Sequence, residues 1–301
     1  LGHEGSGVVE AVGSEVHDIV VGDHVALLWM PACGKCEPCR HGFHHRCELA
    51  PLINRGPQID GSYRRRDASG ANVGAACMVG AFAEKTVVDQ ASVVVVDRDL
   101  SFDAVALSAC SVCGGFGAAV HATCVRPGDT VLVIGAGGSG LTAVQAARMS
   151  GAARVISADR HDWKLQEALR LGATDTVLVK ADGELAGKIM EMTGGKGVDH
   201  GIICAGSIDA LVQAYRATGV GGAVVMSGIM PPSDHIPLAP IEILFGNGKT
   251  LVGSSYGGHS PLTGIPEVLE HFRHGRLKIE EMITRSYPLE EIARGYEDLA
   301  A

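Results

Sequence analysis

The segment that most constrains the fold runs from Thr130 to Asp159, and it predicts a βαβ unit. The apolar run Thr130–Ile134 leads into the turn Gly135-Ala136-Gly137-Gly138-Ser139-Gly140, after which a helical stretch begins. A second apolar run, Ala153–Asp159, follows the helix and ends in a carboxylate. Strand, glycine turn, helix, strand and acid in this order are typical of a dinucleotide-binding unit.

Each glycine of the turn has a physical role. Gly135 allows a sharp turn, Gly137 lets backbone N–H groups approach a pyrophosphate, and Gly140 lets the helix pack close to the strand. The N-terminus of the helix offers unpaired N–H groups to an anion. Asp159 lies nineteen residues after Gly140, where a carboxylate is expected to meet the ribose hydroxyls. A purely structural glycine turn is the alternative, and the agreement of all these parts favours the dinucleotide site.

Strands and helices alternate after this unit, which predicts an α/β domain with a doubly wound parallel sheet. Together with the first two strands, the later ones make six, the number found in doubly wound dinucleotide domains. The later strands are predicted at Asp175–Val179, Val198–Ala205, Ala223–Ser227 and Thr250–Gly253. The helices are predicted at Lys164–Leu171, Leu185–Met192, Ile208–Thr218 and Ile241–Phe245.

The N-terminal part of the chain has a different pattern. Short β runs broken by Gly-Asp turns predict a small antiparallel barrel in residues 1–30, with a further β run at Val93–Val96. Residues 104–121 predict a helix, a segment loosened by glycines and then a second helix. The last residues predict a helix at Pro261–His274, an extended run at Ile283–Tyr287 and a helix at Leu289–Leu299, which return to the first domain.

Four cysteines form the pattern C-x2-C-x2-C-x7-C, at Cys33, Cys36, Cys39 and Cys47. Two-residue spacing lets a tight turn aim successive sulfur atoms at one point, as tetrahedral zinc requires. Four thiolates leave no open position, so we predict a structural zinc site. Free or disulfide-bonded cysteines and an iron–sulfur cluster are the alternatives. We expect His41, His44 and His45, within the last spacer, to be surface residues.

Composition excludes some classes of function. The net charge of −9 argues against nucleic-acid binding, which needs a basic face. No apolar run approaches the length needed to span a bilayer, and no signal peptide is found, so we expect no membrane partner. Nine cysteines, an odd number, fit metal ligands and free thiols better than a disulfide framework. A reducing, cytoplasmic setting follows.

Over nearly its whole length the sequence resembles the zinc-dependent medium-chain alcohol dehydrogenases. The features that carry the resemblance follow the family's order: Gly2-His3-Glu4-Gly5, the four-cysteine lobe, Cys110 with its glycines, Gly135–Gly140 and Asp159. Within the family it is most similar to the nicotinoprotein type, which uses a nitroso-dimethylaniline acceptor. Residues 58–64 and 283–289 carry that closer likeness. The resemblance implies a GroES-like, β-rich catalytic domain and a Rossmann domain.

The resemblance also implies roles for single residues. His3 and Cys110 correspond to two ligands of a catalytic zinc, and Glu4 to the carboxylate beside it; a Cys2His zinc site in alcohol dehydrogenase is a known example. It makes Cys110 the ligand rather than Cys113. A redox role for this C-x-x-C pair is disfavoured on other grounds, because thioredoxin-like motifs follow a strand in a different βαβ setting; two buried, small apolar residues are the alternative. The four lobe cysteines correspond to the structural zinc ligands. The predicted cofactor-binding residues are Gly135, Gly137, Gly138, Ser139, Gly140, Asp159, Lys164 and Gly228.

The predicted function is hydride transfer between a primary alcohol or aldehyde and NAD, with one structural and one catalytic zinc. One alternative is a thiol-dependent formaldehyde dehydrogenase, with Arg64–Arg66 as its anion site. Pro51 stands where the glutathione-dependent branch has an arginine, which argues against that alternative. A non-catalytic nucleotide-binding protein is the other alternative. We expect a homo-oligomer.

The predicted catalytic domain comprises residues 1–111 and 255–301, and the predicted Rossmann domain residues 112–254. The family's third zinc ligand, a cysteine, and its Ser or Thr proton relay lie upstream of Gly2-His3-Glu4. The sequence opens at Leu1 and stops at Ala301, before the family's final strand. We therefore expect a chain shortened at both ends, with little activity of its own.

Overall fold

The structure is a computed structural model that describes residues 1–246 and 248–300. The chain divides into two compact units. The first contains Leu1–Cys110, Pro261–Arg273 and Lys278–Ala301, and the second contains Ser111–Ser260 and His274–Leu277.

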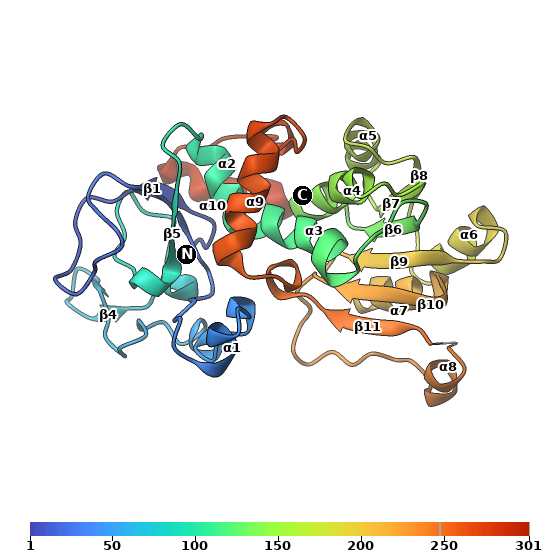
Figure 1. The fold of residues 1–301 in the computed structure, drawn as a ribbon, viewed down its shortest axis with the longest axis horizontal. Helices are drawn as coiled ribbons and strands as arrows, with labels where there is room; N and C mark the ends of the chain where they lie inside the picture. Colours follow the sequence, from blue (N-terminus) through green and yellow to red (C-terminus); the bar gives the residue numbers. More distant parts are fainter. Residues whose placement is uncertain (247, 301) are drawn as a thin grey trace. The chain divides into compact units, whose positions relative to one another are not determined.

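A six-stranded, wholly parallel sheet is the centre of the second unit (Figure 1). Its strand order, β11-β10-β9-β6-β7-β8, places the first strand in the middle and reverses direction there, which is the doubly wound Rossmann arrangement. The strands are β6 (Thr130–Ile134), β7 (Arg154–Asp159), β8 (Asp175–Leu178), β9 (Val198–Ile203), β10 (Thr218–Met226) and β11 (Thr250–Gly253). The predicted fold class is confirmed.

Helices connect successive strands of this sheet. They are α4 (Gly138–Met149), α5 (Asp162–Arg170), α6 (Leu185–Met192), α7 (Ile208–Ala217) and α8 (Pro240–Leu244). Side chains alternate between the two faces of a strand, so a strand covered on both faces must be apolar throughout. β6 meets this requirement, because its last four residues are buried. On one face Leu132, Ile156 and Ile203 pack with Ile189 of α6 and Leu211 of α7.

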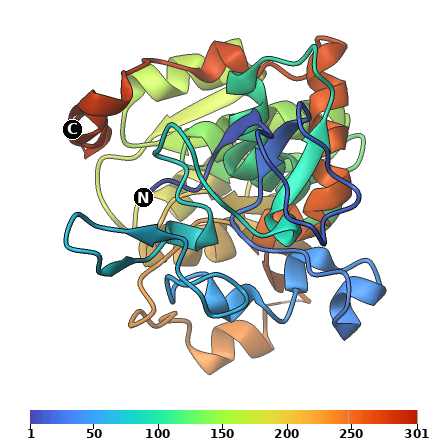
Figure 2. The ribbon, with the colours of Figure 1, turned by 90° about the vertical axis from the view of Figure 1, so that its left-hand side faces the viewer.

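The first unit is built around a three-stranded antiparallel sheet. Strand β2 (His24–Leu27) lies between β1 (Ser6–Val8) and β5 (Val93–Val96). A two-stranded ribbon joins β3 (Arg65–Arg66) and β4 (Asn72–Val73). We predicted a small barrel for this part of the chain. In the residues that the structure describes, the three strands form an open sheet instead, so the prediction of a closed barrel is wrong. Long loops with short helical turns occupy much of residues 31–92, as Figure 2 shows.

The helices of the first unit are short, apart from α9. They are α1 (Glu37–Arg40), α2 (Phe102–Leu107), α9 (Pro261–Arg273) and α10 (Ile292–Ala300). Single helical turns in this unit lie at His44–Arg46, Ala50–Leu52, Ala76–Met78, Gln90–Ser92, Glu280–Met282 and Leu289–Glu291, and one in the second unit lies at Ser255–Gly258. No strand is assigned at residues 283–287, where we predicted an extended run.

The glycines after Cys113 do not interrupt the helix there, contrary to the prediction. A continuous helical run of 21 residues, Phe102–Ala122, contains α3 (Cys113–Gly117) between two π-helical turns, Ser108–Val112 and Ala118–Ala122. With a mean hydropathy of 1.5, it is long and apolar enough to cross a membrane, so the prediction that no run has this length is wrong. However, 61% of the 18-residue stretch that has this mean hydropathy is buried inside the protein, and the core helix of a protein passes the same test.

Candidate dinucleotide and zinc sites

The glycine turn between β6 and α4 is shaped by close backbone contacts. Gly135 has a φ of 94°, and a Cβ on Gly140 would lie 1.7 Å from the Gly135 carbonyl oxygen. A Cβ on Gly115 of α3 would likewise lie 2.0 Å from the Ser139 carbonyl oxygen. By contrast, a Cβ on Gly137 would meet nothing within 4 Å. The turn is therefore tightly packed at Gly140 and against Gly115, and it is open at Gly137, where a phosphate has room.

Asp159 is tied to this turn by its own carboxylate. One oxygen, Oδ2, accepts a hydrogen bond from the Ala136 N–H at 2.7 Å. The other, Oδ1, accepts one from the His161 N–H at 2.9 Å. The acid at the end of β7 is thus held against the end of β6. Ala136 is a contact that the sequence pattern does not reveal, because it lies at one of the variable positions of the motif.

Two other predicted cofactor residues, Gly228 and Lys164, lie in segments that follow the carboxyl ends of strands of the same sheet. The Gly228 N–H donates to the Ile203 carbonyl at the end of β9 at 2.8 Å, and a Cβ on Gly228 would lie 2.3 Å from the Ala205 carbonyl oxygen. Lys164 lies in the first turn of α5, with its ammonium group 5.4 Å from the centre of the Trp163 ring. In doubly wound sheets, ligands bind outside the carboxyl ends of the strands, next to the point where the strand order reverses.

The cysteine lobe brings four sulfur atoms together. The Sγ atoms of Cys33, Cys36, Cys39 and Cys47 all lie within 4.8 Å of one another, and two pairs are 4.0 Å apart. Four thiolates on a tetrahedral zinc with bonds of about 2.3 Å lie about 3.8 Å apart. The donor set and its spacing therefore fit a zinc ion with little movement.

Hydrogen bonding and burial act on these thiols in opposite directions. Burial opposes ionisation of Cys36, but hydrogen bonds from the backbone of Glu48 and Cys39 lower the pKa of its thiol to about 7. Burial raises the pKa of the Cys39 and Cys47 thiols. Since zinc binds thiolates, binding must release protons from these cysteines.

The prediction that all three histidines of the lobe lie at the surface is wrong for His45. His45 is 6% exposed and packs edge-on against Phe43, with the ring centres 6.2 Å apart. His45 is the buried residue of the helical turn His44–Arg46. It does not belong to the group of cysteines.

A second group of metal-binding side chains lies within the first unit. Ligand atoms of His3, Glu4 and Cys110 lie within 4.8 Å of one another. His3 and Glu4 precede β1, and Cys110 lies in the π-helical turn Ser108–Val112. π-helical turns widen a helix and are frequent at functional sites. Imidazole, thiolate and carboxylate are all ligands that zinc accepts, so this donor set fits the metal. Cys113 is buried and is not part of the group.

A cavity of about 500 Å³ lies beside His3 and Glu4. Its wall includes Phe82 and Tyr296, whose rings meet edge-on with centres 6.0 Å apart, and Tyr287. Sequence patterns did not single out these aromatic residues as lining residues, because they come from distant segments of the chain. The cavity therefore offers an apolar surface next to the proposed zinc ligands.

Arg64, Arg65 and Arg66 are occupied by contacts within their own part of the chain. Arg64 forms an ion pair with Asp60 at 2.7 Å. Arg65 donates to the Val79 carbonyl at 2.8 Å, and Arg66 donates to a nearby carbonyl at 3.1 Å. These contacts stabilise the loop and weaken the case for an anion site there.

Comparisons with known proteins identify both units. Residues 1–98 match the alcohol dehydrogenase GroES-like domain, and residues 138–272 match the zinc-binding dehydrogenases. The NDMA-dependent alcohol dehydrogenase of Amycolatopsis methanolica is 38% identical over 303 residues, which cover 99% of this chain and 80% of that protein.

Two solved structures are also similar over the full chain. An alcohol dehydrogenase zinc-binding domain protein from Burkholderia ambifaria has a TM-score of 0.90 at 32% identity, with 100% of this chain and 80% of that one covered. Benzyl alcohol dehydrogenase from Acinetobacter calcoaceticus has a TM-score of 0.87 at 30% identity, with the same coverage. The chain thus spans about four-fifths of the length of these proteins.

Proposed function

We propose that this chain, which belongs to the zinc-dependent medium-chain alcohol dehydrogenase family, transfers a hydride between a primary alcohol or its aldehyde and NAD. As a member of this family it is a zinc-dependent alcohol oxidoreductase. The observation that carries the proposal is the group of His3, Glu4 and Cys110, which brings the neighbouring His3 and Glu4 together with Cys110, a residue far away in the sequence.

The proposed metal-binding residues divide between a catalytic and a structural zinc. We assign His3 and Cys110 as catalytic zinc ligands, with Glu4 as the carboxylate beside the metal. When bound, zinc supplies a Lewis acid that polarises an alcohol oxygen, and NAD supplies the hydride acceptor. The four lobe cysteines are proposed to hold a second, structural zinc, which stabilises the long loop around them.

NAD is proposed as the cofactor because of how Asp159 is held. Its two carboxylate oxygens are fixed by the N–H groups of Ala136 and His161, and they keep lone pairs for the ribose hydroxyls. The open side of Gly137 and the N-terminus of α4 suit the pyrophosphate. The predicted domains, 1–111 with 255–301 and 112–254, are proposed as the catalytic and cofactor-binding parts.

A primary alcohol with an apolar group is the proposed substrate. Benzyl alcohol, on which the Acinetobacter enzyme acts by its name, is such an alcohol. The cavity lined by Phe82, Tyr287 and Tyr296 offers a matching apolar wall. The thiol-dependent formaldehyde alternative is weaker, since Arg64–Arg66 are occupied by neighbouring groups.

The chain is proposed to form a homo-oligomer in the cytoplasm, with no nucleic-acid or membrane partner. Strand β11 is at the edge of the parallel sheet, and an unpaired edge favours association. Nearby apolar side chains are exposed, among them Leu244 at 74% and Phe245 at 69%. All nine cysteines lie in the described residues and none forms a disulfide there, which fits a reducing compartment.

Zinc content and NADH formation test the proposal together. Cys110→Ser should lower the zinc content from about two ions per chain to about one and reduce NADH formation from benzyl alcohol. Cys113→Ser is the matched control, because it changes a buried cysteine outside the group. Unchanged zinc content in Cys110→Ser would contradict the assignment. Cofactor binding without any alcohol oxidation, at full zinc content, would favour the non-catalytic alternative.

A further inference from the structure

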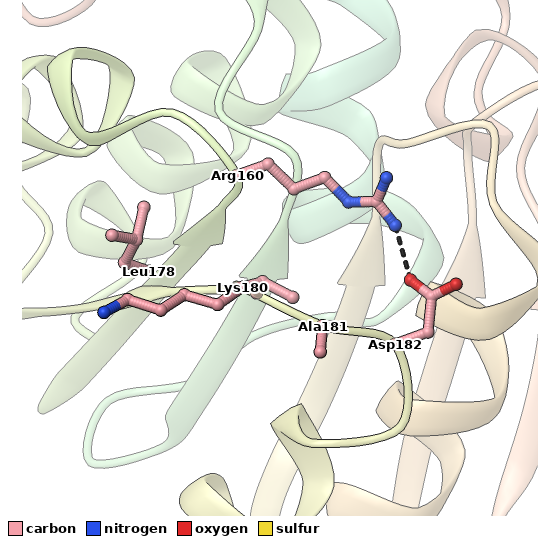
Figure 3. Close-up of a pocket in the computed structure, with 6 residues that line it drawn as sticks. Arg160, Leu178, Lys180, Ala181 and Asp182 are labelled. Carbon is pink, nitrogen blue, oxygen red and sulfur yellow. Dashed lines mark hydrogen bonds and ion pairs between the residues drawn. The ribbon is translucent and has the colours of Figure 1, made fainter.

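A second acidic residue near the end of the parallel sheet, Asp182, lies in the loop that follows β8. It forms an ion pair with Arg160, the residue that follows Asp159, with 2.5 Å between guanidinium and carboxylate. Figure 3 shows the Arg160 side chain reaching across the ends of the strands toward Asp182. Both residues line an open cleft of about 520 Å³ together with Leu178, Lys180 and neighbouring residues.

The backbone around Asp182 is fixed on both sides. Before it, the Lys180 N–H donates to the Glu184 carboxylate at 2.6 Å, and the Ala181 N–H donates to the same oxygen at 3.3 Å. After it, the Gly183 N–H donates to the Asp209 carboxylate at 3.2 Å. The loop therefore presents the Asp182 carboxylate at a defined place beside Arg160.

Two nearby lysines, Lys180 and Lys164, are not paired with Asp182 in the way that Arg160 is. The Lys180 side chain extends away from Asp182 in Figure 3. Lys164 is placed over the Trp163 ring. Arg160 is the cation joined to Asp182, and it is adjacent in sequence to the acid proposed to bind the ribose. An arginine at this place normally accommodates the 2′-phosphate of NADP.

We propose that Asp182 is a positioning residue for cofactor selectivity, which holds the Arg160 guanidinium so that it is not offered to a 2′-phosphate. The inference rests on the proposed use of NAD at Asp159. In this arrangement Asp159 repels the phosphate, and Asp182 withholds the cation that would offset that repulsion. Two acids on neighbouring strand ends thus select the unphosphorylated ribose.

The expected effect is modest, because both partners are exposed. The side chains of Arg160 and Asp182 are 65% and 67% exposed, and pairs of this kind contribute little. Release of Arg160 should therefore shift the ratio of the NADPH and NADH dissociation constants by about fivefold at most. Asp159 remains the stronger discriminator.

The test measures both dissociation constants by quenching of tryptophan fluorescence, since Trp163 lies next to Lys164. The variants are Asp182→Asn, Asp182→Ser, Arg160→Ala and the double variant Asp182→Asn with Arg160→Ala. Competition by 2′,5′-ADP and 5′-AMP repeats the comparison with the adenosine half alone. Glu167→Gln is the control, because it removes one negative charge from the exposed Arg170 pair on α5.

Asp182→Asn and Asp182→Ser should each favour NADPH and 2′,5′-ADP by about threefold to fivefold, and Arg160→Ala should cancel this gain in the double variant. A gain that persists without Arg160 would overturn the proposal, since Asp182 would then act only by its own charge. An unchanged ratio in both Asp182 variants, with NADH still bound, would overturn the inference alone. Failure of the unaltered chain to bind NADH would overturn the proposed function and this inference with it.

Discussion

Replacement of Asp159 by alanine tests the proposed cofactor site most directly. The variant leaves two backbone N–H groups without their acceptor, those of Ala136 and His161. Hydrogen bonds to a charged acceptor contribute about 1.5–3 kcal/mol, and exposed ones less. Ala136 is 2% exposed, whereas His161 is exposed, so we expect a loss of about 2–3 kcal/mol in the free energy of unfolding.

The effect on NADH binding should be of similar size in free energy. Two hydrogen bonds to the ribose hydroxyls, at about 1.5 kcal/mol each, correspond to an increase of about 100-fold in the dissociation constant. Fluorescence titration of the folded variant measures it, and urea denaturation measures the stability. Asp159→Asn, which keeps one acceptor oxygen, should show about a tenfold increase.

Asp162→Ala is the matched control, because it removes an acid from the first turn of the helix that follows Asp159. Its NADH dissociation constant should change by less than about threefold, since helix-terminal charges contribute little. If Asp159→Ala folds and binds NADH within threefold of the unaltered chain, the assignment of Asp159 to the ribose is wrong.

Three other substitutions test the zinc lobe and the Rossmann sheet. Cys39→Ser should remove about one zinc per chain, measured by metal analysis, and unchanged zinc would place the structural site elsewhere. Gly140→Ala should prevent folding of the second unit or lower its free energy of unfolding by at least about 3 kcal/mol, measured by urea denaturation, because the new Cβ would lie 1.7 Å from the Gly135 carbonyl oxygen. A variant as stable as the unaltered chain would show that the turn can rearrange. Arg154→Ala should cost about 1–2 kcal/mol at neutral pH, since Arg154 donates twice to Asp175 at 2.8 Å and lowers its pKa. Arg154 also donates to the Met192 carbonyl at 2.6 Å, and that part of the cost does not depend on pH. A carboxylate with a lowered pKa stabilises the fold above its ordinary value of 3.8, so the part of the cost that comes from the ion pair should vanish as the pH falls below the pKa of Asp175 in the folded state. A cost wholly independent of pH would contradict the ion pair.

Local patterns predicted the second unit well. The six strands and the connecting helices were found from periodicity and glycine signals, and the main differences are at their ends; β10, for example, begins at Thr218 rather than Ala223. The pattern missed these residues because a register shift lies between them. The first unit was predicted less well, since its loops carry no periodic signal and its three strands pair with partners far away in the sequence.

The sequence by itself determined the features whose cause is local. The four lobe cysteines lie within fifteen residues, and the glycine turn directly connects a strand to a helix. Sequence spacing alone therefore predicted the cysteine group and the glycine turn. The tertiary structure decided which distant groups meet. His3 and Cys110 are separated by more than a hundred residues, and Arg160 meets Asp182 only because β7 and β8 are neighbours in the sheet. Such contacts depend on strand order and loop paths, which no short pattern encodes, because packing of the whole domain fixes them.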